Sequence, residues 1–143
     1  AIEAKRREEE ITTTLQLATI VSDAIPFKEG RIHPATRVFQ AIRIAVNGEL
    51  DELKSGLEQA VNLLSKQGRL AVISFHSLED RIVKHFMRDK SEVKDLFPDL
   101  PILITDSKPV LKTVGKAVRA SKEECAANVR SRSAILRIAE KIE

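Results

Sequence analysis

The stretch SFHSLEDR, residues 74–81, sets hydroxyl, imidazole, carboxylate and guanidinium groups between an apolar run, LAVI, and a segment with helical spacing. Ligands of an open α/β sheet bind beyond the carboxyl ends of its strands, so this stretch is a candidate site. Ser77 and Asp80 have the spacing of a helix cap, with the acid at the positive end of the helix dipole. His76 has no role in such a cap and could contact a base or phosphate, although a lone histidine is more often structural. His76, Ser77 and Asp80 are therefore candidates for one wall of a cleft, and no catalytic residue is assigned.

Two other kinds of chemistry are not predicted. His76, Ser77 and Asp80 share one turn, so they do not form a recognisable base, nucleophile and orienter of a hydrolase triad. Three scattered histidines and a single cysteine provide no zinc-binding cluster. We predict no metal and rank a hydrolase far behind the alternatives below.

Two basic segments could bind phosphate. After His33-Pro34, which suits a helix start, Arg37 and Arg43 lie near one helical face, although a solvated polar face explains this row equally well. Arg130 and Arg132 lie at the start of the last expected strand, where alternation would direct both to one side. A charged strand edge that prevents sheet-to-sheet aggregation is the alternative there. The candidate RNA-binding residues are His33, Arg37, Arg43, Arg130, Arg132 and Ser133.

The composition indicates one domain with a substantial core. The 143 residues are 43% hydrophobic and carry a net charge of +3, which does not by itself indicate a nucleic-acid partner. From residue 108 onward, nine Lys or Arg stand against four acids, so the last quarter is the basic part. A single cysteine excludes an internal disulfide and no apolar run could cross a bilayer, so we expect a cytoplasmic protein without a membrane partner. Because the sequence starts on Ala1 inside a helical segment, we expect a piece of a longer chain.

Periodicity predicts the elements that would position these residues. Helices are expected at residues 2–25, from about 34 to 47, at 50–65, from 77, and briefly after 121, and strands at 69–75, 101–105 and 131–138. The apolar stripe from Val38 to Val46 should face a core. The strand at 69–75 should be covered on both faces, and the strand at 131–138 should lie at or near a sheet edge.

The expected order is helix, strand, helix and then two strands. This order is typical of the carboxyl half of a doubly wound α/β domain. No G-x-G occurs in the sequence, so the glycine turn that cradles a nucleotide in such sheets is not expected here. Half a sheet would leave the apolar flank of residues 70–75 open. We therefore expect the chain to self-associate.

Three blocks in order, HPATRVFQAIRIAVNGELDEL, GRLAVISFHSLEDRIVKHFM and NVRSRSAILRIAE, resemble the MraW family of ribosomal RNA small-subunit methyltransferases. The resemblance covers nearly the whole chain and is least distinctive at residues 92–122. It implies an S-adenosylmethionine-dependent enzyme that methylates N4 of a cytidine in 16S ribosomal RNA, near the decoding centre of the small ribosomal subunit. It also implies a class I, Rossmann-like domain interrupted by a helical substrate-recognition insertion. Residues 1–48 would be the later part of that insertion, and residues 49–143 the carboxyl half of the catalytic domain.

The same resemblance places the family's glycine-rich cofactor motif, its ribose-binding acid and its target-amine loop ahead of Ala1. No cofactor-binding residue is therefore expected in this chain, and the chain alone should be inactive. Val129 stands where the family usually has proline, while the neighbouring arginines are kept. The arginines named above would hold RNA, and His76 would line the cleft. The alternative is a naturally short, non-enzymatic RNA-binding or assembly module.

Overall fold

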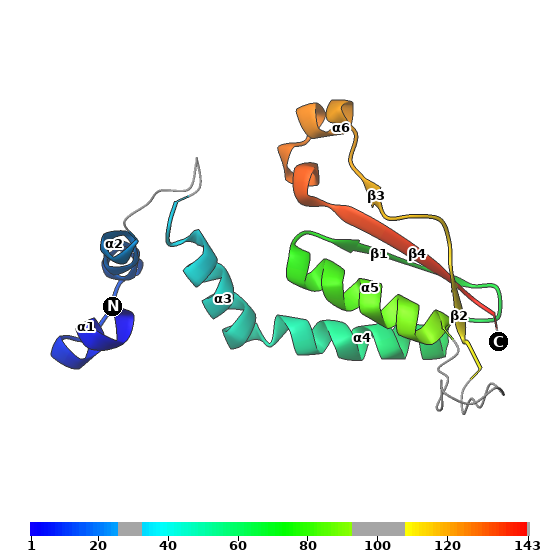
Figure 1. The fold of residues 1–143 in the computed structure, drawn as a ribbon, viewed down its shortest axis with the longest axis horizontal. Helices are drawn as coiled ribbons and strands as arrows, with labels where there is room; N and C mark the ends of the chain where they lie inside the picture. The colour runs from blue at the N-terminus through cyan, green and yellow to red at the C-terminus, as the bar shows by residue number, and fades with distance from the viewer. Residues whose placement is uncertain (26–32, 93–107, 143) are drawn as a thin grey trace, which may run out of the picture. The chain divides into compact units, whose positions relative to one another are not determined.

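The computed structural model describes residues 1–25, 33–92 and 108–142 (Figure 1). The chain divides into two compact units, Ala1–Glu49 and Leu50–Glu143. The strand expected at residues 101–105 lies outside the described residues.

In its described part, the first unit consists of the helices α1 (Ile2–Glu8), α2 (Thr14–Ala24) and α3 (Thr36–Asn47). The single helix predicted over residues 2–25 is wrong, because Thr13 caps a new one. Its hydroxyl accepts from the Gln16 amide, and the Gln16 side chain accepts from the Thr13 amide. The predicted end before Pro26 is confirmed, since α2 stops at Ala24.

The apolar stripe of α3 is not buried as predicted. Ala41, Ile42, Ala45 and Val46 are all exposed, whereas other apolar residues of the helix are half-buried. Helical spacing identified an amphipathic helix correctly, but spacing alone does not supply the surface that would cover it. The helix ends at Gly48, whose φ of 62° lies in the left-handed region that glycine adopts without strain.

The second unit alternates helices and strands. Its elements in chain order are α4 (Glu49–Leu63), β1 (Arg69–Ser74), α5 (Ser77–Ser91), β2 (Leu111–Thr113), β3 (Val118–Arg119), α6 (Lys122–Ala127), the 3₁₀ helix η1 (Val129–Ser133) and β4 (Ile135–Lys141). The short helix expected after Ser121 is confirmed, and the Ser121 hydroxyl accepts from the Glu124 amide 3.1 Å away.

All strand pairs of the small sheet are antiparallel within the described chain. The order is β1-β4-β2, and β3 also pairs with β4. The last strand is therefore central, so the prediction that it lies at or near an edge is wrong. Its position was also wrong, because residues 129–133 form η1 and the strand begins only at Ile135.

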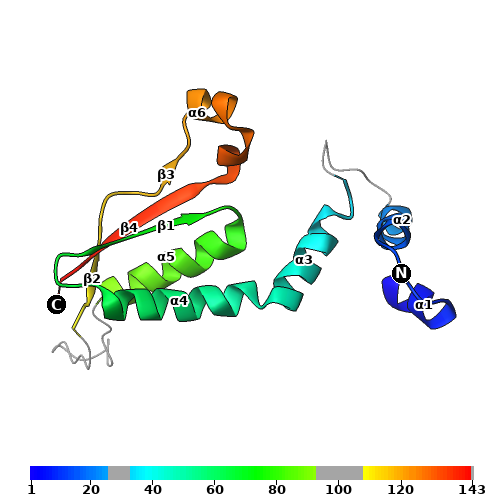
Figure 2. The same cartoon turned by 180° about the vertical axis from the view of Figure 1, so that it is seen from behind.

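The core lies on one face of this sheet, where α4 and α5 pack (Figure 1), and the opposite view agrees (Figure 2). Its buried residues are Leu57, Val61, Val83, Met87, Leu111 and Ala139. The Lys141 ammonium group also donates to the carbonyl oxygens of Val61 and Leu64, at 2.9 and 2.7 Å, and so joins β4 to the end of α4. On α5, Val83 and Met87 are buried and Ile82 and Phe86 pack against the core, whereas Leu78 is 41% exposed.

The other face of the sheet is open among the described residues. Side chains of β1 alternate, so that Leu70, Val72 and Ser74 face the helices while Ile73 does not. Ile73 is 58% exposed and Phe75 56% exposed. The prediction that this strand is covered on both faces is therefore wrong.

The observed architecture is mixed helix and sheet, as predicted at the level of fold class. Within the described ranges, no helix is both long and apolar enough to cross a bilayer.

Candidate functional site

The turn between β1 and α5 is organised by His76, which is the N-cap of the helix. The His76 Nδ1 atom accepts a hydrogen bond from the Glu79 amide at 3.3 Å. The Glu79 carboxylate in turn accepts from the amides of Phe75 and His76, at 2.8 and 3.2 Å. The prediction that Ser77 caps α5 is therefore wrong, because Ser77 is already its first helical residue and is exposed. His76 has the structural role that the sequence did not reveal, since an imidazole nitrogen replaces the usual hydroxyl or carboxylate acceptor.

Asp80 is also not part of the cap. Its two carboxylate oxygens accept from Arg137 of β4, at 2.7 and 3.0 Å, and both side chains are about four-fifths buried. The hydrogen bonds from Arg137 hold the pKa of Asp80 below its ordinary value, although burial opposes the shift, and the charges of Arg119 and Lys84 add smaller effects in the same direction. This pair fastens the first turns of α5 to the sheet.

Two buried polar atoms in the turn have no hydrogen-bond partner in the described chain: the Ser74 hydroxyl oxygen and His76 Nε2. Ser74 is only 2% exposed, and His76 Nε2 lies 3.4 Å from a Glu79 carboxylate oxygen without a hydrogen bond. Buried polar groups are nearly always paired, so unpaired ones at the end of a strand are candidates for contact with a ligand. Ser74 was not among the residues predicted from the sequence.

In the first unit, His33 and Arg43 make local contacts. The His33 Nδ1 atom accepts from the Ala35 amide at 3.2 Å, and the His33 carbonyl oxygen accepts from the Thr36 amide at 3.0 Å. Arg43 forms a bidentate ion pair with Glu49, in which its Nε and Nη2 atoms donate to the two carboxylate oxygens at 2.8 and 3.0 Å. His33 and Arg43, two of the predicted RNA-binding residues, therefore also have structural contacts. Arg37, another of them, lies in the first turn of α3 and its side chain is exposed.

Arg130, Arg132 and Ser133 lie on η1 and are exposed. A 3₁₀ helix has three residues per turn, so side chains two positions apart diverge. The prediction that the two arginines point to one side is therefore wrong, and so is the alternative of a charged strand edge. The Ser131 hydroxyl donates to the Asn128 carbonyl oxygen at 2.7 Å, and Asn128 Oδ1 accepts from the Arg130 amide, so η1 has a defined conformation.

The strand register brings η1 and the His76 turn to the same end of the sheet. Ser74, the last residue of β1, pairs with Ile135, the first residue of β4. The chain therefore enters β4 from η1 at the end where it leaves β1 for α5, as Figure 1 shows. Exposed guanidinium groups and the unpaired polar atoms of Ser74 and His76 thus belong to one region, which we call the carboxyl-end region, residues 74–80 and 129–133.

Sequence reasoning missed two contributors to this region, Ser74 and Glu79, and it also missed Arg137 of β4, the partner of Asp80. Glu79 stands three residues after His76, which is the capping-box spacing, and that signal was available. Arg137 could have been found only with the correct bounds of β4, because its partner lies 57 positions away.

The sequence matches the MraW methylase family over residues 1–142. It is 62% identical over 136 residues to ribosomal RNA small subunit methyltransferase H of Hydrogenovibrio crunogenus, covering 95% of this chain and 43% of that protein. The proteins of the same name from Legionella pneumophila strain Corby and Alteromonas mediterranea are 56% and 53% identical, each covering 99% of this chain and 46% of the relative. The chain thus spans less than half the length of these curated relatives. It belongs to the MraW methylase family.

Proposed function

We propose that this chain is the carboxyl part of a methyltransferase that modifies the RNA of the small ribosomal subunit. The acceptor is N4 of a cytidine in 16S ribosomal RNA near the decoding centre, and the methyl donor is S-adenosylmethionine. The observation that carries the proposal is the family match over residues 1–142. The carboxyl-end region supports it, because the exposed arginines of η1 adjoin the turn that leads from β1 into α5, and guanidinium groups bind phosphate.

The residues that the structure describes do not fit the methyl donor. Nucleotide-like cofactors on such sheets are held by a glycine-rich turn between a strand and a helix. The described strand-to-helix turn after β1 contains no glycine, and Gly115 lies between two strands. We therefore assign no residue of this chain to the cofactor, and propose that the chain alone is inactive.

We propose that residues 1–48 are the later part of a helical insertion that recognises substrate, and that residues 49–143 are the carboxyl half of a Rossmann-like catalytic domain, acting in the cytoplasm. In the second part, Arg130 and Arg132 bind RNA phosphates, assisted by Ser133. In the first part, His33, Arg37 and Arg43 bind the same RNA substrate.

The role of the His76 turn is to position the target base. A cytidine must leave its stack to reach an enzyme pocket, and a flipped base is recognised through hydrogen bonds to its edge. The Ser74 hydroxyl and His76 Nε2 are the polar atoms suited to such contacts. Holding the amine in place is the main contribution that these residues make to methyl transfer.

A chimera tests this function. The corresponding 43% of the Hydrogenovibrio crunogenus relative is replaced by this chain, and the product is incubated with S-adenosylmethionine and undermethylated small subunits. Mass spectrometry of the RNA should find N4-methylcytidine, and Arg130→Gln/Arg132→Gln in the chimera should raise the KM for the subunit several-fold. This chain alone is the negative control. A folded chimera that transfers no methyl group, beside an active parent relative, would refute the proposal.

A further inference from the structure

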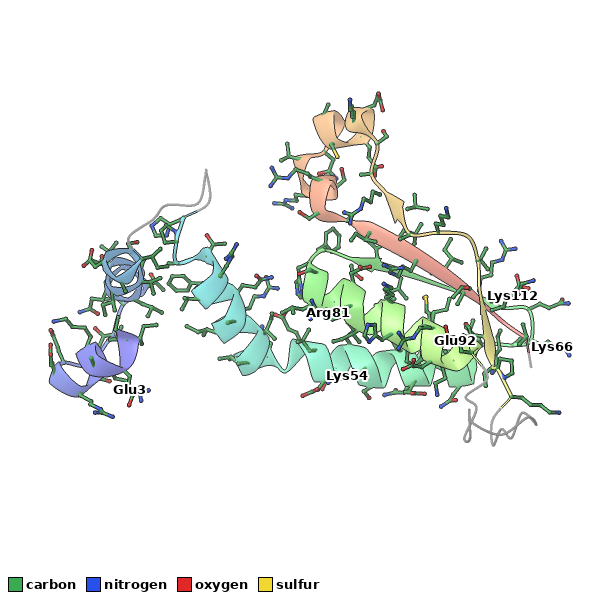
Figure 3. All side chains as sticks on the ribbon, viewed as in Figure 1. Glu3, Lys54, Lys66, Arg81, Glu92 and Lys112 are labelled. Carbon is green, nitrogen blue, oxygen red and sulfur yellow. The ribbon has the colours of Figure 1, made fainter. Side chains whose placement is uncertain are left out.

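A cavity of about 460 Å³ lies beside α5, where the chain passes from β2 to β3. Lys84 and Arg88 of α5 line it on one side, Lys116 of the β2–β3 connection on another, and Arg137 of β4 also contributes. Glu92, labelled in Figure 3 at the end of α5, is the acidic residue of the lining. The cavity is separate from the His76 turn, whose residues do not line it.

The charges of this cavity are only partly neutralised. Arg137 is held by Asp80, and Arg88 is paired with Asp89 at 2.9 Å and Glu92 at 3.9 Å. Lys84 and Lys116 are exposed. The charge of Lys84 acts weakly on Asp80, but neither lysine forms a hydrogen bond or ion pair with another described residue. Two ammonium groups thus remain available at the rim, while buried Met87 contributes apolar surface.

The β2–β3 connection adds backbone donors to these side chains. Gly115 has a φ of 68°, and the Val114 amide before it donates to the Ile138 carbonyl oxygen at 2.9 Å. The amides of Gly115 and Lys116 have no backbone acceptor in the described chain. Amides that have no backbone acceptor in the described chain, at a bend that lines the cavity beside ammonium groups, suit an oxyanion.

We propose that this cavity binds a phosphodiester group of the substrate RNA. The proposal rests on the proposed function, because it takes the ligand to be the RNA that the carboxyl-end region also contacts. Lys84 is seven residues beyond Ser77, or about 10 Å along the helix, and RNA spans such a distance within a few nucleotides. The RNA strand that enters the carboxyl-end region would therefore continue along α5, where Lys84 and Lys116 bind its phosphodiester backbone.

The test compares two double variants of this chain in binding a single-stranded oligonucleotide with the decoding-centre sequence of 16S ribosomal RNA. Lys84→Gln/Lys116→Gln removes the rim charges. Lys66→Gln/Lys112→Gln removes the same net charge outside the cavity, at two exposed lysines labelled in Figure 3. Fluorescence anisotropy over a salt series should give about tenfold weaker binding for the first variant. The slope of log K against log salt should fall by about 1.4, at about 0.7 for each phosphate contact to a single strand.

The control variant should retain wild-type affinity and slope, and Lys84→Arg/Lys116→Arg should restore most of the binding. Equal losses in both Gln variants would overturn the proposal, since net charge alone would then explain them. Wild-type binding by Lys84→Gln/Lys116→Gln would also overturn it. The proposed function would survive either result, because its test is methyl transfer by the chimera. Equal circular-dichroism melting curves would exclude unfolding as the cause of a loss.

Discussion

At the residue scale, His76 combines a structural contact with a candidate binding atom. Nδ1 caps α5 through the Glu79 amide, whereas Nε2 is buried without a hydrogen-bond partner in the described chain. The two nitrogens of an imidazole can act separately, so Nδ1 caps the helix while Nε2, 3.4 Å from a Glu79 carboxylate oxygen, is left without a hydrogen bond among the described residues. Loss of His76 would therefore affect stability and base contact together, and the two effects must be separated.

We predict that His76→Ala lowers the free energy of unfolding by about 1 kcal/mol, the usual cost of losing an N-cap acceptor. His76→Ser should recover most of this loss, because a serine hydroxyl can accept from the Glu79 amide. Urea unfolding of this chain measures both values. In the chimera, both variants should lower methyl transfer, since neither supplies the Nε2 edge. Wild-type turnover by His76→Ser would reduce His76 to its structural role.

At the scale of elements, the Asp80–Arg137 pair links the first turn of α5 to β4, beside the core packing of Val83 and Met87. A hydrogen-bonded ion pair that is mostly buried contributes more than an exposed one. We predict that Asp80→Asn lowers the free energy of unfolding at pH 7 by about 2 kcal/mol, because the Arg137 guanidinium group loses its charged acceptor. Asp51→Asn is the matched control, since it breaks an exposed ion pair with Lys54 on α4 and should change stability little.

The same pair gives a pH dependence with a definite sign. The pKa of Asp80 is lower in the folded chain than its ordinary value of 3.8, so the stabilisation is complete above that value. It is lost as the pH falls through the lower, folded pKa. The difference in stability between wild type and Asp80→Asn should therefore shrink below pH 4, about the ordinary Asp value, in urea titrations. A difference that stays constant down to pH 2 would contradict this origin.

Local sequence signals predicted some elements well. They failed to predict features that depend on contacts between segments far apart in the sequence. Helix α4 and the Ser121 cap of α6 follow from spacing and capping within a few residues, and both are confirmed. The letters RSRS alternate as a strand would, yet the Asn128 side chain and the Ser131 hydroxyl stabilise a 3₁₀ turn there. The central position of β4 and the contact of Arg137 with Asp80 depend on pairing between distant segments, which periodicity does not encode.

At the scale of the whole molecule, one face of the sheet carries apolar side chains that no described element covers. On that face the register sets Ile73 opposite Leu136 and Ala71 opposite Ile138, and Val118 of β3 is also exposed there. Among the described residues, β1 pairs with β4 along one edge only. An apolar face next to an unpaired edge is the combination that favours association between chains.

We therefore predict that this chain, expressed by itself, self-associates through β1 and the open face. Light scattering should give a mass above that of the 16.0 kDa monomer at micromolar concentration. Ile73→Lys should shift the population toward monomer, because it places a charge within the apolar face. Leu63→Lys is the matched control, since Leu63 is an exposed apolar residue of α4 and its replacement should leave the mass unchanged. A monodisperse wild-type monomer would mean that the open face, despite its apolar side chains, is tolerated in water.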